Sequence, residues 1–219
     1  MTRILKMALR FLLPLALLVL LRPGSLQAAS AQLMILHQDG VVGDVQVQHG
    51  AMQKFIRGLP PGVDVAVAYF RYGTLEMQTD FTSNHEKAAA GVRVPLSAAS
   101  ETSGTYDALV EAVKRLSERN GKKVLAFFSD GVDSLHDMDF ETPDQNPALV
   151  KAIDLARRNG IKIYTVYARG QNFPGKQKFE GTSFLNYLAE KTGGKAFLET
   201  TVSYDPVFRE LKRELEAAY

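Results

Sequence analysis

Short apolar runs alternate along the chain with segments in which apolar residues recur every three or four positions. The runs are typical of buried strands, and the spaced segments are typical of amphipathic helices. The predicted strands cover residues 33–38, 63–70, 75–82, 122–128, 161–168 and 195–200. The predicted helices cover residues 44–58, 103–120, 143–159, 182–192 and 203–219. The strand of residues 75–82 alternates apolar and polar residues, so we expect it to pair as a hairpin with residues 63–70 across Tyr72-Gly73.

The order of these elements predicts an α/β fold. Near-continuously apolar strands that alternate with helices form a mostly parallel, doubly wound central sheet flanked by helices. The hairpin adds one antiparallel edge strand. In such folds ligands bind at the carboxyl ends of the strands, where the strand order reverses. We therefore expect the working edge of the sheet at the ends of residues 33–38 and 122–128 and at the loop before Ser103.

The first 31 residues have the composition of an export signal. A basic start is followed by the apolar run FLLPLALLVLL, and Ala29, Ser30 and Ala31 match the small-x-small pattern that signal peptidase cleaves. The apolar run is shorter than the roughly 20 residues that span a bilayer. We expect residues 1–31 to be removed, which leaves a domain of residues 32–219 that is periplasmic or secreted and has no stable membrane span. The alternative is an uncleaved membrane anchor.

Charge and motifs argue against several classes of function. Four of the 26 basic residues precede the first acid, which leaves 22 basic and 24 acidic residues in the rest of the chain. This balance gives no electrostatic case for binding nucleic acid. The four histidines do not have zinc-site spacing, and no G-x-S-x-G, phosphate-loop or S-x-x-K motif occurs. We therefore expect a protein that is not an enzyme.

Three stretches bring polar groups to the predicted working edge. They are ILHQDGV after the first strand, ETSGTYDAL at the start of a helix, and LAFFSDGVDS at the end of a middle strand. The last stretch places Asp130 at the mouth of a buried strand, where a carboxylate is costly unless it is bound or solvated. Four partners are open for Asp130: a cation, the backbone amides around Val132-Asp133 in an Asx-type turn, water, or the imidazole of His37. The simpler interpretation of His37 is a strand-end histidine whose hydrogen bonds are satisfied elsewhere.

Together these stretches resemble the motifs of a von Willebrand factor A (vWA) domain, which has a Rossmann-like α/β fold. The C-terminal half, with GIKIYTVYARG and FLNYLAEKTGGKAFL, resembles the vWA-related proteins that acidobacteria export. The resemblance covers nearly all of the chain after the signal, and it implies a protein-binding module for adhesion or scaffolding. Most vWA domains hold a divalent cation, such as Mg²⁺, at a metal-ion-dependent adhesion site. That cation takes a carboxylate from the partner protein.

The cation site that the resemblance implies is only partly present. Its family pattern is Asp-x-Ser-x-Ser after the first strand, a Thr in the middle loop and an Asp after the fourth strand. Asp130 matches the last element, and either Ser103 or Thr105 matches the Thr. The candidate metal ligands are therefore Asp39, Ser103, Thr105 and Asp130.

The first element of the family pattern fails. Aligned by strand length, His37 stands at the Asp position, Asp39 at the first Ser and Val41 at the last Ser. If the motif instead begins at Asp39, then Val41 and Gly43 replace the two serines. Two oxygen donors are missing in both registers, so a Mg²⁺ ion or another divalent cation would be held weakly, and we expect none. The acidic loop of residues 136–144 is a second-choice cation contact.

Two functions follow from these observations. The first is an exported vWA-like protein-binding module with a degenerate metal-ion-dependent adhesion site. Its binding face would comprise residues 38–44, 101–106 and 130–140, and its protein partner is not identified by the sequence. The alternative is a structural envelope-assembly domain that binds no cation.

Overall fold

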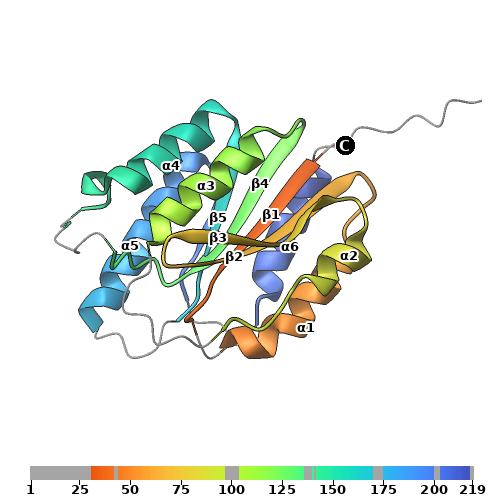
Figure 1. Cartoon of the computed structure of the whole chain (residues 1–219), viewed down its shortest axis with the longest axis horizontal. Helices are drawn as coiled ribbons and strands as arrows, with labels where there is room; N and C mark the ends of the chain where they lie inside the picture. The colour runs from red at the N-terminus through yellow and green to blue at the C-terminus, as the bar shows by residue number, and fades with distance from the viewer. Residues whose placement is uncertain are drawn as a thin grey trace, which may run out of the picture.

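The computed structural model describes residues 31–41, 44–96, 104–135, 140, 142–169, 175–199 and 203–217. The described chain forms one sheet with helices on both faces (Figure 1). The strands are β1 (Ala31–Gln38), β2 (Val63–Arg71), β3 (Thr74–Thr82), β4 (Lys122–Ser129), β5 (Ile161–Tyr167) and β6 (Ala196–Phe197). The helices are α1 (Asp44–Arg57), α2 (His85–Ala90), α3 (Thr105–Ser117), α4 (Pro147–Arg158), α5 (Gly175–Thr192) and α6 (Asp205–Glu216), with a 3-10 turn η1 (Pro143–Gln145) before α4.

The sheet has the strand order β3-β2-β1-β4-β5-β6. Every neighbouring pair is parallel except β2 and β3, which form the antiparallel hairpin. The predicted fold class is therefore confirmed. The order reverses between β1 and β4, and His37 lies opposite Phe128 in their register. The ends of the first and fourth strands thus lie side by side, at the position where α/β sheets bind ligands.

Two apolar layers enclose the sheet. Helices α1, α2 and α6 pack on one face, and α3, α4 and α5 pack on the other (Figure 1). All eight residues of β1 are buried, which explains why its sequence is apolar without alternation. The apolar residues that recur every three or four positions on α3, α4 and α6 are buried: Leu109, Val110, Val113, Leu116, Leu149, Ile153, Ala156, Val207, Phe208, Leu211 and Leu215.

Most elements differ from their predicted extents at one or both ends, and α2, α5 and β6 show the physical reasons. Helix α2 was not predicted, because a single hexapeptide is too short to show a helical period; the side chain of Asn84 caps it by accepting a hydrogen bond from the Lys87 amide at 3.0 Å. Helix α5 begins at Gly175 rather than at residue 182. Phe179 is the one large apolar residue among residues 175–181, so no apolar stripe marks these turns in the sequence, and its side chain is exposed. Strand β6 has two residues rather than the predicted six.

The predicted signal lies outside the described residues, apart from Ala31. This residue is fully buried as the first residue of β1, opposite Val63 and Lys122. No helix in the described part of the chain is both long enough and apolar enough to cross a membrane. The boundary between signal and domain stays a prediction.

Candidate functional site

Asp39 directly follows β1, and its carboxylate is held by protein groups. Both terminal nitrogens of Arg93 donate to it, Nη1 to Oδ1 and Nη2 to Oδ2, each at 2.8 Å. The backbone amide of Leu96 also donates to Oδ1 at 2.8 Å. A bidentate guanidinium–carboxylate pair is one of the strong charge-assisted interactions. The hydrogen bonds to Asp39 raise the pKa of Arg93 above its ordinary value, and the guanidinium balances the negative charge of Asp39 inside the protein.

Arg93 belongs to a short segment, residues 92–96, that we call the strap. The guanidinium of Arg93 lies 3.8 Å from the ring centroid of Tyr69 on β2. The Tyr69 hydroxyl donates to the Arg93 carbonyl at 2.5 Å and accepts from the Arg93 amide at 2.9 Å. At the far end of the strap, the Gly40 amide donates to the Leu96 carbonyl at 2.9 Å. The strap is therefore fixed across the carboxyl ends of β1 and β2.

Asp130 follows β4 and is 3% exposed. Its Oδ1 accepts a hydrogen bond from the Val132 amide at 3.0 Å, which is the Asx-type turn that the sequence left open as one interpretation. Burial raises the pKa of this carboxyl to about 6, and the hydrogen bonds from Val132 and from the side chain of Gln38 oppose that rise. Asp130 is thus a desolvated acid held by neutral donors, without the guanidinium that Asp39 has.

Gln38 connects the ends of β1 and β4 at the point where the strand order reverses. Its Oε1 accepts from the Ser129 hydroxyl at 2.6 Å and from the Asp130 amide at 3.0 Å. The Ser129 hydroxyl in turn accepts from the Gly131 amide at 3.0 Å. This role of Gln38 was not predicted, although a buried amide at the last position of an apolar strand is a signal of such a role.

The turn after Asp130 is enclosed by two helices. From the first turn of α3, the Thr105 hydroxyl donates to the Val132 carbonyl at 2.5 Å, and the Tyr106 hydroxyl donates to the Gly131 carbonyl at 2.9 Å. On the other side α5 packs directly on the backbone: a Cβ on Gly131 would lie 2.2 Å from the Gly181 carbonyl oxygen. Gly131 also has φ +75°, so a glycine is required there for two reasons.

His37 does not take the place of a metal beside Asp130. Its Nδ1 donates to the Gln38 carbonyl at 2.9 Å, and its ring stacks between Tyr69 and Phe128 with centroid separations of 5.6 and 5.4 Å. Its Nε2 is buried and has no hydrogen-bond partner among the described residues. Burial lowers the pKa of His37 to about 4, so the ring is neutral at pH 7. The hydrogen bonds of Asp130 instead involve Gln38 and Val132.

The structure brings together three of the four candidate ligands. Asp39 and Asp130 end neighbouring strands, and Thr105 reaches the same turn through Val132. Ser103 lies outside the described residues, as does most of the acidic loop. Each of the three is engaged by protein groups, and Val41 is a buried apolar residue where the family pattern has an oxygen donor. The described residues contain no group of three or more His, Cys, Asp or Glu side chains suited to a metal ion.

Apolar side chains are exposed at the same edge. Five large apolar residues are exposed in the described part of the chain, with exposed fractions of 41 to 75%: Tyr72, Val94, Leu96, Leu135 and Phe179. We call these five residues the apolar edge.

Each member of the apolar edge lies at the carboxyl ends of the strands. Tyr72 is in the β2–β3 turn, and Val94 and Leu96 are on the strap. Leu135 follows β4 and comes within 3.6 Å of the position of a Cβ on Gly73, in that same turn. Phe179 precedes Gly181, which packs on the Asp130 turn. In the described part of the chain, the exposed large apolar side chains thus belong to segments at this end of the sheet.

No protein-family model and no curated protein matches the sequence. The fold is similar to that of an aerotolerance-related membrane protein from Bacteroides fragilis, with 12% identity, coverage of 85% of this chain and 99% of that chain, and a TM-score of 0.61. It is also similar to the vWF domain of the type V pili tip protein Mfa5 from Porphyromonas gingivalis (11% identity, 87% and 96% covered, TM-score 0.58). For a von Willebrand factor type A structure from Catenulispora acidiphila the values are 18% identity, 84% and 42% covered, and TM-score 0.53. At these identities the similarity concerns the fold, and the chain has the fold of a vWA domain.

Proposed function

We propose that this protein is an exported, non-enzymatic protein-binding module that contacts its partner through the carboxyl edge of the sheet without a divalent cation. The apolar edge is the observation that carries the proposal. Exposed apolar groups collected on one end of a monomer mark a surface that another molecule covers. The export signal predicted at residues 1–31 and the resemblance to exported vWA-related proteins of acidobacteria support the extracytoplasmic location.

The partners of Asp39 support binding that is independent of a cation. In a complete metal-ion-dependent adhesion site, the ion neutralises the first-strand acid and offers an open position to a carboxylate of the partner. Here Arg93 neutralises Asp39, and its guanidinium nitrogens are directed at that acid. The site is then a degenerate one, in which internal hydrogen bonds hold the loops that a cation would otherwise organise.

The same geometry favours binding over catalysis. The Ser129 hydroxyl donates to Gln38, so its proton is directed at an amide oxygen. The free nitrogen of His37 lies in a stack of aromatic rings rather than beside a nucleophile. The fold of a pilus tip domain and of an aerotolerance-related membrane protein is consistent with a role in contacts between proteins.

Site-specific photo-crosslinking in the producing cell tests the proposal. A photo-reactive amino acid is placed at Tyr72 or at Leu135 on the apolar edge, and at exposed Asn120 in the turn at the opposite end of the sheet as the control. We expect Tyr72 and Leu135 to crosslink to the same protein, with a yield that EDTA does not change, and Asn120 not to crosslink to it. Crosslinking that EDTA abolishes would contradict the cation-free mechanism. A domain that binds through other surfaces would crosslink no better at Tyr72 and Leu135 than at Asn120.

A further inference from the structure

The two edges of the sheet are built differently. The pairing of β3 with β2 shifts register twice, between Val65 and Val67 and between Val67 and Ala68. Such irregularities bend and twist an edge strand and discourage pairing with another chain. Strand β6 at the opposite edge pairs regularly with β5, with Ala196 opposite Thr165 and Phe197 opposite Val166.

The outer side of β6 carries backbone groups directed away from the sheet. The Lys195 carbonyl accepts from the Thr165 amide of β5 at 3.0 Å. Because successive residues of a strand direct their N–H and C=O groups to opposite neighbours, Lys195 and Phe197 face β5, and Ala196 and Leu198 face outward. In the described part of the chain, no strand pairs with that outer side.

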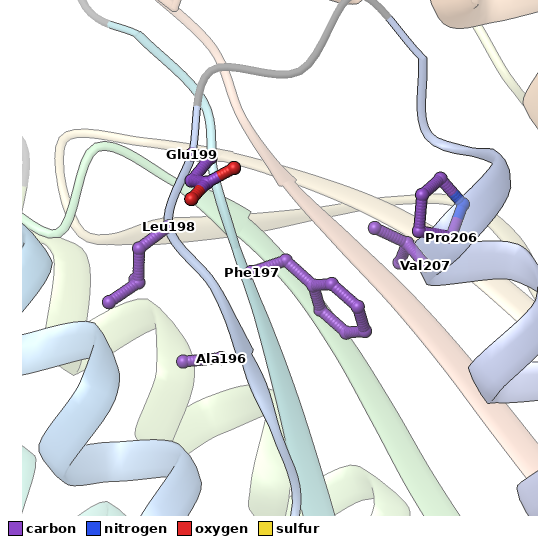
Figure 2. A pocket seen from close by; sticks show the side chains of 6 residues that line it. All are labelled: Ala196, Phe197, Leu198, Glu199, Pro206 and Val207. Atoms are coloured by element: carbon purple, nitrogen blue, oxygen red, sulfur yellow. The ribbon is translucent and has the colours of Figure 1, made fainter.

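An apolar pocket lies beside this strand. Its volume is 410 Å³, and it is lined by Ala196, Phe197, Leu198, Glu199, Pro206 and Val207. Figure 2 shows the Phe197 ring directed toward the start of α6 and the Leu198 side chain on the other side of the strand. The Lys195 Nζ lies 5.3 Å from the Phe197 ring centroid, so these two side chains share a face. Glu199 lies two residues after Phe197, in the bend that follows β6, and it lines the same pocket.

We propose that β6 pairs antiparallel with β6 of a second copy of this chain, around a two-fold axis at Phe197. In this register, Ala196 lies opposite Leu198 of the second copy, so the outward backbone groups of the two copies form hydrogen-bonded pairs. Lys195 lies opposite Glu199 of the second copy, and Glu199 lies opposite its Lys195. The charges at the two ends of this short segment are therefore self-complementary, as a two-fold interface requires.

The same register brings the two Phe197 rings together. Residues that lie directly opposite each other in an antiparallel pair place their side chains on the same face. Phe197 of the second copy thus lies beside Phe197, across the outer side of β6, on the face of the sheet that carries α6. The two rings would form the apolar cross-strand contact of the interface.

Charge reversal tests the register. Sedimentation of the full chain over a range of concentrations is compared for wild type, Lys195→Glu and Glu199→Lys. Each single variant places like charges opposite each other in both cross-strand pairs, and we expect its self-association to weaken on the order of tenfold. An equimolar mixture of the two variants restores both opposite-charge pairs and should associate as the wild type does. Lys114→Glu, on the exposed side of α3, is the matched control and should not change association.

A cysteine crosslink gives an independent measurement, because the chain has no cysteine. Phe197 forms a non-hydrogen-bonded pair with itself across the two-fold axis, where Cα atoms are about 4.5 Å apart, a distance that a disulfide bridges. We expect Phe197→Cys to give a disulfide-linked dimer under mild oxidation, and exposed Tyr72→Cys to remain mostly uncrosslinked. Wild type that stays monomeric at all concentrations, or single charge variants that associate as strongly as wild type, would overturn the proposal. Crosslinking at Tyr72→Cys that equals that at Phe197→Cys would do the same.

Discussion

Asp39 and Asp130 lie at the ends of neighbouring strands and are almost equally buried, at 6% and 3% exposed. Their hydrogen-bond partners nevertheless differ. Asp39 receives a guanidinium in bidentate geometry, whereas Asp130 receives an amide hydrogen bond from Val132 and an uncharged partner in Gln38. Burial consequently raises the pKa of Asp130 to about 6. A buried acid at the carboxyl end of a strand therefore does not by itself indicate a metal site. The group that pairs with such an acid determines its role. For Asp39 this group is Arg93, which lies 54 positions further along the chain.

Removing the guanidinium should have the largest effect. Arg93→Ala leaves the Asp39 carboxylate buried without its counter-charge, and we expect a loss of about 3–5 kcal/mol in the free energy of unfolding. The control is Arg158→Ala, because Arg158 and Asp154 form an exposed pair on α4 and its loss should cost less than about 1 kcal/mol. Urea denaturation measures both. A loss at Arg93 no larger than that at Arg158 would mean that Asp39 does not depend on this pair, and Arg93→Ala/Asp39→Asn should recover part of the loss.

The pH dependence of stability should separate the second acid from the first. Because the folded pKa of Asp130 is about 6 and its ordinary value is 3.8, the folded state binds the proton more tightly, and this group lowers stability as the pH rises from 3.8 to 6. Asp130→Asn removes that loss. We therefore expect the free energy of unfolding of the variant, relative to wild type, to increase by about 3 kcal/mol over this range. Chemical denaturation at several pH values measures the difference, and a difference that does not change with pH would show that Asp130 is not desolvated.

The contribution of His37 to the free energy of unfolding should change with pH in the opposite direction. Its folded pKa of about 4 lies below the ordinary 6.5, so the unfolded state binds the proton more tightly, and this group adds stability as the pH rises from 4 to 6.5. His37→Phe keeps an aromatic ring between Tyr69 and Phe128 but does not titrate. Its stability relative to wild type should fall by about 3 kcal/mol as the pH rises through this range. In wild type the pH dependences that Asp130 and His37 give to the free energy of unfolding oppose each other. Only the two single variants separate them.

Replacing Gln38 should have an intermediate effect. Gln38→Leu keeps the size of the side chain but leaves the Ser129 hydroxyl and the Asp130 amide without their acceptor in a buried site, which costs about 1–3 kcal/mol. Gln78→Leu is the matched control, because the Gln78 amide bonds the exposed Glu76 on the edge strand β3. Unfolding curves that coincide for the two variants would argue against the bridge between β1 and β4.

Changes on the apolar edge should have the smallest effect on stability. Leu96 and Leu135 are 47% and 46% exposed, so Leu96→Ser and Leu135→Ser should each change the free energy of unfolding by about 0.5 kcal/mol or less. We expect the same variants to lower the yield of the crosslink formed through Tyr72. Unchanged yield in the double variant would contradict the assignment of this edge as the binding face.

The fold was predictable because its signals are local. In continuous apolar runs such as VDVAVAYF, and in amphipathic helices such as α3, the spacing of the apolar residues indicates which side chains are buried. The alternation of these elements determines the class of the sheet. The working edge followed from the expected strand order, and the Asp-Gly pair at 130–131 indicated a turn. The pairing of Asp39 with Arg93 was not predictable in the same way. It joins residues 54 positions apart. The strap also has no periodicity that would indicate its path.

A calorimetric titration of the protein with Mg²⁺ and Mn²⁺ at neutral pH tests whether Arg93 takes the place of a cation beside Asp39. If Arg93 neutralises Asp39 in place of a cation, the titration gives no saturable heat, and Asp39→Ala and Asp130→Ala give the same flat curve as wild type. A saturable heat in wild type that both substitutions abolish would contradict this account.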